Sequence, residues 1–206
     1  MSASDPMTTN PDALVIPGRE CGTCTLCCKV YNIPEIAKPA GKWCKHCLPG
    51  KGCSIHDKLP HQCATFNCRW RTEEAMLSHW KPELSKMVVT VHPRNGYIYI
   101  RVDPGTPAAW RRQPYYDELR QLARINLESG IYVVVFVNDT VTLVLPDLDM
   151  PLNTSGPIDR ISVRKRFGAG GATYDVTLDS PPHSGSAEPV AASAPQSDGG
   201  TISAGR

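Results

Sequence analysis

The residues with the most distinctive chemistry in this sequence are nine cysteines, which all lie between residues 21 and 68. The first four follow a C-x2-C-x2-C-C pattern. Thiolates two residues apart can bind one soft cation, because a tight turn brings both sulfurs to the same side and points backbone amides towards them. The pattern therefore indicates metal binding by cysteines drawn from Cys21, Cys24, Cys27, Cys28, Cys44, Cys47, Cys53, Cys63 and Cys68.

Two known metal-site patterns fit part of this set. Four cysteines are spaced as C-x2-C-x16-C-x2-C, which falls within the zinc-ribbon spacing of about 15 to 20 intervening residues. These four are Cys24, Cys27, Cys44 and Cys47. The first three cysteines also match the start of a bacterial ferredoxin, but the C-x3-C-P continuation is absent because Cys28 follows Cys27 directly. The spacing is therefore compatible with zinc and disfavours a ferredoxin of that standard type.

Five short pieces of sequence form an ordered pattern around the cysteines. They are Cys21-x2-Cys24-x2-Cys27-Cys28, Gly41-Lys-Trp-Cys44, Gly52-Cys53-Ser-Ile55, Pro60-x2-Cys63 and Phe66-Asn-Cys68-Arg-Trp70. This pattern, which covers residues 19 to 71, resembles a zinc- or iron-chelating cysteine-cluster family that is defined by its CxxCxxCC opening. The resemblance implies eight metal-site cysteines, namely Cys21, Cys24, Cys27, Cys28, Cys44, Cys53, Cys63 and Cys68.

Cys47 lies outside the eight positions that the resemblance implies. We therefore expect Cys47→Ser to lower the metal content less than Cys21→Ser or Cys27→Ser does. The chain also departs from the family pattern at His56 and Leu59, where the family has a Tyr and an Arg. No role of that Tyr or that Arg carries over to this chain.

The number of thiols bears on the number of metal sites. Eight thiolates exceed the four that one tetrahedral site uses, so they favour two four-ligand sites or a polynuclear cluster. Zinc, iron and an iron–sulfur cluster all satisfy this ligand chemistry, and the spacing does not separate them. Three histidines lie among the cysteines as further candidate ligands or supporting groups: His46, His56 and His61. Five lysines are close enough in sequence to moderate the thiolate charge: Lys29, Lys42, Lys45, Lys51 and Lys58.

The cysteine-rich stretch has few large aliphatic residues and many glycines and prolines, so it needs a metal or another staple to fold. The polar, small-residue ends of the chain have little to bury. We therefore predict a disordered segment at 1–18, a cysteine-rich metal-binding module at 19–71, an α+β domain at 72–179 and a disordered tail at 180–206.

The α+β domain is predicted to contain, in order, a hairpin, a helix and two further hairpins. The first hairpin joins residues 87–92 and 97–102 through Asn95-Gly96, a pair that favours a type I′ turn. A helix is expected from the Thr106-Pro107 cap to Gly130, and a shorter one at 72–80. The second hairpin joins 131–137, a strand with the composition of one buried on both faces, to 141–145. The third surrounds 168–171.

Together these elements predict an α+β fold. We expect a metal-stapled irregular cysteine-rich module that packs on a small antiparallel β-sheet with one main helix. No constellation of residues identifies an enzymatic reaction, and the clustering of the thiols at ligand spacing disfavours a Cys-His nucleophile.

Net charge and hydropathy restrict the kinds of binding partner and the location that the sequence allows. A formal net charge of +2 is too small for a nucleic-acid or membrane footprint. The sequence has no secretory signal and no 18-residue apolar run, so we expect a cytoplasmic protein with reduced thiols. Its first predicted function is metal binding with zinc, iron or an iron–sulfur cluster. The alternatives are an iron–sulfur redox or electron-transfer component, and a zinc-ribbon-like module that binds nucleic acid or protein.

Overall fold

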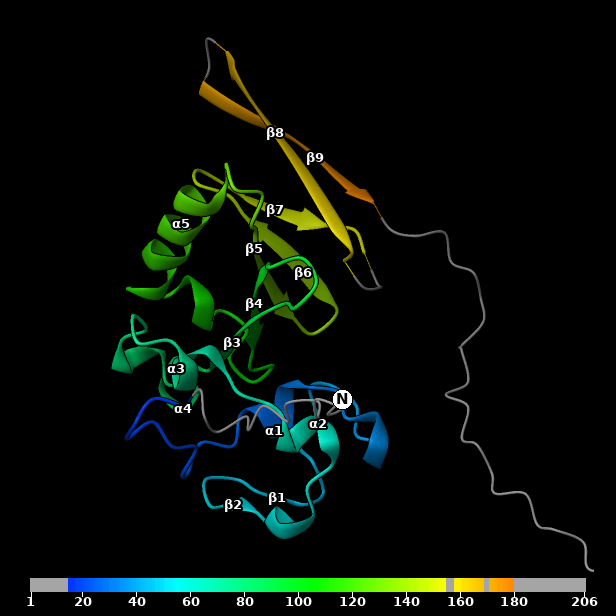
Figure 1. The fold of residues 1–206 in the computed structure, drawn as a ribbon. Coiled ribbons are helices and arrows are strands. Elements are labelled where there is room, and N and C mark those ends of the chain that lie inside the picture. The colour runs from blue at the N-terminus through cyan, green and yellow to red at the C-terminus, as the bar shows by residue number, and fades with distance from the viewer. Residues whose placement is uncertain (1–14, 155–157, 169–170, 180–206) are drawn as a thin grey trace, which may run out of the picture.

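The computed structural model describes residues 15–154, 158–168 and 171–179. The predicted disordered ends lie outside these ranges, apart from residues 15–18. Within the described part, the cysteine-rich segment occupies one end of the molecule and a long two-stranded hairpin the other, with a five-stranded sheet between them (Figure 1). No helix in this part of the chain is long and apolar enough to cross a membrane.

The central sheet has the strand order β3-β4-β5-β6-β7. Its strands are β3 (Met87–Val91), β4 (Ile98–Val102), β5 (Val133–Val137), β6 (Thr140–Val144) and β7 (Asp149–Leu152). The α+β class is confirmed, but the sheet is not wholly antiparallel because β4 and β5 pair in parallel. The long crossover between these two strands contains the main helix α5 (Tyr115–Asn126), and parallel neighbours require such a crossover. β7 was not predicted.

The first two hairpins are confirmed, but the predicted type I′ turn at Asn95-Gly96 is wrong. Gly96 has a positive φ of 73° and Asn95 does not, whereas a type I′ turn needs both. The Asn95 side chain instead accepts a hydrogen bond from Tyr97 N–H (3.1 Å) and donates to the carbonyl of Ile158 (3.2 Å). Its amide therefore ties the loop to the segment that leads into the last hairpin.

The main helix begins at Tyr115 and not at the Thr106-Pro107 cap. The intervening residues form a short 3₁₀ helix, η5 (Ala109–Arg111), and Pro114 precedes α5. Pro114 has no N–H and keeps the residue before it out of the helical region, so one continuous helix cannot form. The short helix predicted at 72–80 is also wrong. α3 (Arg69–Thr72) ends where it should begin, η4 (Ser78–Trp80) covers only its last three residues, and α4 (Pro82–Ser85) follows it.

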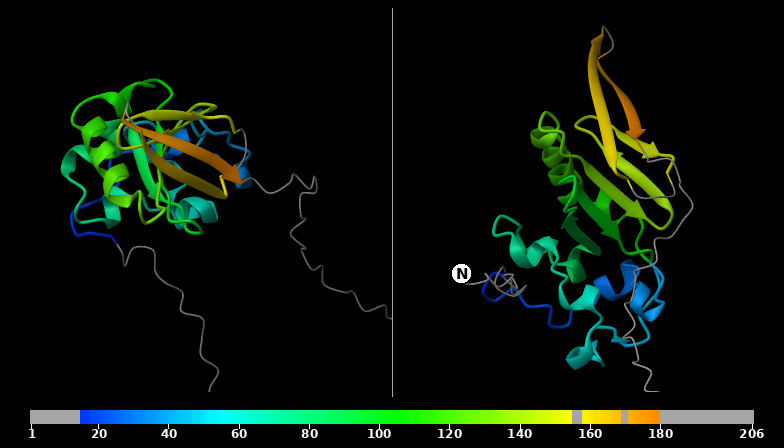
Figure 2. Two further views of the ribbon diagram at one scale, coloured as in Figure 1. Left: turned by 90° about the horizontal axis from the view of Figure 1, so that it is seen from above. Right: turned by 45° about the vertical axis from the view of Figure 1, so that its right-hand side comes forward.

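Both faces of the central sheet are covered. Val133 and Val135 of β5 are buried with Leu119 of α5, while Val134 faces a second core that includes Leu143. This confirms that β5 is buried on both faces. The third predicted hairpin, β8 (Arg160–Gly168) with β9 (Gly171–Asp179), packs on the second core and projects beyond the sheet (Figure 2). Its predicted loop, apart from residues 168 and 171, lies outside the described residues.

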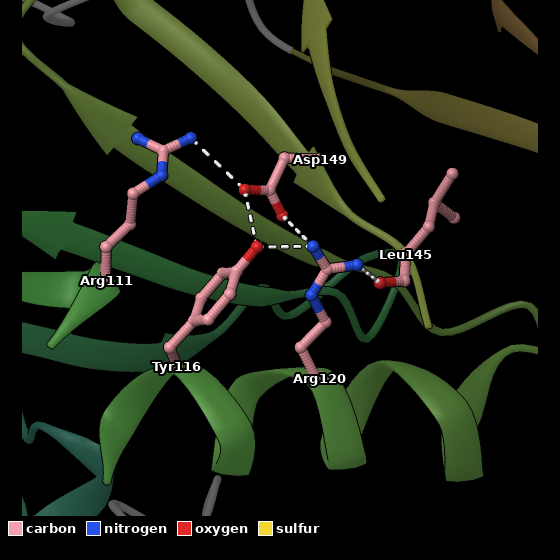
Figure 3. Close-up of polar contacts among 5 residues, drawn as sticks. All are labelled: Arg111, Tyr116, Arg120, Leu145 and Asp149. Atoms are coloured by element: carbon pink, nitrogen blue, oxygen red, sulfur yellow. Dashed lines mark hydrogen bonds and ion pairs between the residues drawn. The ribbon is translucent and has the colours of Figure 1, made fainter. Parts of the chain in front are cut away.

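One polar cluster holds α5 to the edge strand β7 (Figure 3). Asp149, whose side chain is 13% exposed, accepts a hydrogen bond from Tyr116 (3.0 Å) and lies 3.1 Å from Arg111. Its other oxygen lies 3.2 Å from Arg120 as an ion pair without hydrogen-bond alignment. Arg120 also donates to the carbonyl of Leu145 (2.8 Å). Every charged group here has a partner, so the cluster stabilises the fold and offers no free reactive group.

The cysteine-rich segment shares its core with the sheet. Leu26, Val30 and Trp70 are buried together with Val88 of β3. The segment contains α1 (Cys27–Val30), η2 (Pro34–Ile36), β1 (Cys47–Leu48), β2 (Gly52–Cys53), η3 (His56–Lys58) and α2 (His61–Ala64), followed by α3. It is therefore anchored on the α+β domain by apolar packing on the side of α1 and α3.

Candidate metal centre

All nine cysteines lie in the described part of the chain, and all nine are free thiols. Cys44, Cys47 and Cys68 are buried, Cys21 is exposed, and the other five are partly buried. They come from several short elements: the turn before α1, the first turn of α1, the β1–β2 ribbon and the loop before it, α2, and the residue before α3. The fold therefore collects thiols from segments that lie up to 47 positions apart in the sequence.

Four of the thiols form one neighbourhood, which we call site A: Cys21, Cys24, Cys27 and Cys68. The pKa of Cys68 is raised to about 11, first by burial and then by the charges of Cys21 and Cys24. Burial also raises the pKa of Cys24, with a further contribution from Cys21. We include Cys27 because its charge and that of Cys68 both raise the pKa of Tyr31, after the larger effect of burial; Cys27 also borders the second group, since its charge acts on Cys28 and Lys38.

Backbone groups beside two sulfurs of site A offset the effect of burial. Those of Leu26 and Glu83 lower the pKa of Cys24, and that of Arg71, whose N–H donates to the Cys68 carbonyl (2.9 Å), lowers the pKa of Cys68. Glu83 belongs to α4, so site A is fixed to the elements that pack on β3. Amides aimed at sulfur stabilise the thiolate form that binds a metal.

Four other thiols form a second neighbourhood, which we call site B: Cys28, Cys44, Cys53 and Cys63. Burial raises the pKa of Cys63, and the charges of Cys28, Cys44 and Cys53 raise it in turn. The Cys44 N–H donates to the carbonyl of Cys28 (3.1 Å), which holds the loop before β1 against α1. Cys27 and Cys28 share a side-chain hydrogen bond that raises the pKa of Cys28, so the two neighbourhoods meet at the first turn of α1.

Cys47 lies beside site B. Its pKa is raised to about 11, first by burial and then by the charge of Cys28. Its thiol is hydrogen-bonded to Cys28, and the charge of Cys44 acts on it as well. The structure thus brings the ninth cysteine, which the family resemblance leaves out, next to two of the eight.

A buried lysine accompanies site B. Lys38 is only 4% exposed, and its ammonium donates to the carbonyls of Lys29 (2.8 Å) and Tyr31. Burial lowers the pKa of Lys38, while the charges of Cys28, Cys44 and other thiols raise it. Sequence reasoning missed Lys38 because no motif marks it.

The lysines that the sequence suggested are less well placed. Lys29 is paired with Asp103 at 2.5 Å, and the other four are exposed: Lys42, Lys45, Lys51 and Lys58. Of the three histidines, His56 and His61 are exposed and His46 is partly buried. The backbone N–H of His61 donates to Glu35 (2.8 Å) at the start of α2, and that of His46 donates to the Cys44 sulfur (3.4 Å). These two histidines thus contribute main-chain hydrogen bonds to the module.

Among residues 15–154, 158–168 and 171–179, no three Cys, His, Asp or Glu side chains converge closely enough to hold a metal ion as they stand.

Comparison of the chain with protein-family models, with curated proteins and with solved structures gives no match. The resemblance to the cysteine-cluster family therefore rests on the order of the cysteines and stays a prediction.

Proposed function

We propose that this protein binds zinc or iron through eight cysteines, with sites A and B each supplying four thiolates. One observation carries the proposal: the fold gathers nine free thiols from separate segments, with Cys21, Cys24 and Cys68 near one another on one side of α1 and Cys28, Cys44, Cys47, Cys53 and Cys63 on the other. Two tetrahedral all-cysteine sites would use eight of them. An iron–sulfur cluster bound by four cysteines has the same ligand count.

The metal would act first as a cross-link. Helices of four residues such as α1, α2 and α3 are too short to be stable alone. An ion at site A would join the turn before α1 to the start of α3, and an ion at site B would join α1 to the β1–β2 ribbon and α2. A site closed by four protein ligands leaves no open position for substrate, so we propose a structural role for zinc. An iron–sulfur cluster would supply electron transfer.

The reducing conditions of the cytoplasm, where we expect the protein to work, would keep the nine thiols available. Three short basic runs could suggest nucleic-acid binding: Arg69-Trp70-Arg71, Trp110-Arg111-Arg112 and Arg164-Lys165-Arg166. They do not support that alternative, because several of their arginines have acidic partners. Arg69 is paired with Glu73 (3.1 Å), Arg111 with Asp149 (3.1 Å) and Arg166 with Asp175 (2.6 Å). Such pairing is typical of a solvated protein face.

The test is to purify the full chain without oxygen and to measure zinc, iron, acid-labile sulfide and the absorption spectrum. A colourless protein with about two zinc ions per chain supports two mononuclear zinc sites. A brown protein with labile sulfide supports the iron–sulfur form. A reduced chain that takes up neither zinc nor iron on reconstitution refutes the proposal.

A further inference from the structure

The β1–β2 ribbon pairs two cysteines across its strands. Cys47 and Cys53 are direct antiparallel partners, and Leu48 is opposite Gly52. Side chains of opposed residues project from the same face of a ribbon, with their Cβ atoms about 4.5 to 5.5 Å apart. Gly50 and Gly52 have φ values of 70° and 120°, which let the chain turn back within the few residues between the strands. Cys47 and Cys53 are therefore neighbours by virtue of the backbone alone.

The turn before the ribbon adds a third cysteine. In the stretch from Cys44 to Cys47, the Cys47 N–H donates to the Cys44 carbonyl (3.0 Å) and the His46 N–H donates to the Cys44 sulfur (3.4 Å). This is the tight C-x2-C turn in which two sulfurs reach one ion while an amide supports the first of them. Cys44 and Cys47 are thus arranged as a ligand pair.

Thr25 links the segment before α1 to the ribbon. It is 7% exposed, and its hydroxyl oxygen accepts a hydrogen bond from Gly50 N–H (3.3 Å), in the turn between β1 and β2. Thr25 also lowers the pKa of Cys47 against the effect of burial. Hydrogen-bonding groups placed beside metal ligands help to orient them.

Cys63 has a different setting. It lies on the four-residue helix α2 and is partly exposed. Burial raises its pKa, and the charges of Cys28, Cys44 and Cys53 raise it further. Its helix is held by the Glu35 carboxylate, which accepts from the N–H groups of His61 (2.8 Å) and Gln62 (3.0 Å). The position of Cys63 therefore depends on an exposed loop contact, whereas that of Cys47 depends on a turn and a strand pair.

We propose that the metal at site B is bound by Cys28, Cys44, Cys47 and Cys53, and that Cys63 lies beside it as an uncoordinated thiol. This inference rests on the proposed function, since it assumes that site B binds a metal. It reverses the ranking that the family resemblance predicts, in which Cys63 is a ligand and Cys47 is the extra cysteine. Each of the four thiols would lose its proton on binding, so uptake at site B would release about four protons.

The test compares Cys47→Ser with Cys63→Ser in the full-length chain, each reconstituted without oxygen with zinc and separately with cobalt(II). We expect about two ions per chain for the wild type and for Cys63→Ser, and about one for Cys47→Ser, with the cobalt–thiolate charge-transfer band reduced in the same proportion. Loss of an ion from Cys63→Ser, or two ions and an unchanged band in Cys47→Ser, would overturn the assignment. A wild-type chain that binds neither metal refutes the proposed function itself, together with this assignment.

Thr25→Val provides a second route if Cys47→Ser does not fold. This change removes the hydroxyl that accepts the Gly50 N–H hydrogen bond beside Cys47, and it keeps nearly the same volume. We expect a roughly 10- to 100-fold loss of zinc affinity at one of the two sites and no change at the other. Equal zinc affinity in Thr25→Val and the wild type at both sites would contradict the role assigned to Cys47.

Discussion

Lys38 allows a quantitative test of the candidate site, because it is the one buried lysine of the described residues and its charge faces the thiols of site B. Four neutral thiols that bind one zinc ion become a group with a formal charge of about −2. Two unit charges about 8 Å apart at an effective dielectric constant of about 20 attract each other by about 2 kcal/mol, and we use this value for each unit of charge on site B. Lys38→Met removes this attraction from the metal-bound state.

We therefore expect Lys38→Met to weaken zinc binding at site B by about 2 to 4 kcal/mol, or roughly 30- to 1000-fold. The measurement is competition with a chromogenic chelator in a Cys21→Ser background, so that site B alone is titrated. Cys21 suits this purpose because it is exposed, and its replacement disturbs the packing least.

The control is Lys45→Met. Lys45 lies within the C-x2-C turn but is exposed, so solvent and salt screen its charge and the expected effect is below about 1 kcal/mol. A Lys38→Met protein whose zinc affinity stays within about threefold of its parent would refute the electrostatic argument. An equal loss in both variants would refute it too, because burial would then make no difference.

Three further predictions concern the stability of the fold. Asp149→Ala leaves Arg120 without its carboxylate partner in a largely buried cluster. We expect the free energy of unfolding, measured in urea, to fall by about 3 kcal/mol. A fall below about 1 kcal/mol would contradict the stabilising role of the polar cluster between α5 and β7. Leu119→Ala empties a fully buried position under the sheet and should cost about 2 to 5 kcal/mol in the same assay, whereas the exposed Leu84→Ala should change stability by less than about 0.5 kcal/mol. Burial and the hydrogen bond to Asp147 raise the pKa of Tyr174 to about 12, so its contribution to stability is complete below about pH 10 and is lost as the pH rises to about 12. Tyr174→Phe should remove that part of the pH dependence of stability. The prediction is contradicted if the difference in the free energy of unfolding between the wild type and Tyr174→Phe stays constant from about pH 9 to 11.5.

Elements with local signals could be predicted from the residues alone. The β-branched run at β5 and the two-residue turn at Asn138 and Asp139 define a buried hairpin without reference to the rest of the chain, because strand burial and tight turns leave their own pattern in the residues. The clustering of nine thiols is equally local, and it restricts the chemistry to soft metals whatever fold the chain adopts.

The meeting of distant residues, in contrast, depends on tertiary packing. Sequence spacing cannot reveal that β4 and β5 pair in parallel, because the crossover that permits it is a property of the whole sheet. Nor can it reveal the division of the thiols between two neighbourhoods, since Cys68 joins Cys21 only when α3 and α1 pack on β3. The burial of Lys38 also depends on tertiary packing and cannot be read from the sequence. Cys47 is not among the cysteines that the family pattern includes, but the β1–β2 register places it opposite Cys53. Ligand type is a property of the residues, but convergence requires contacts between segments far apart in the chain.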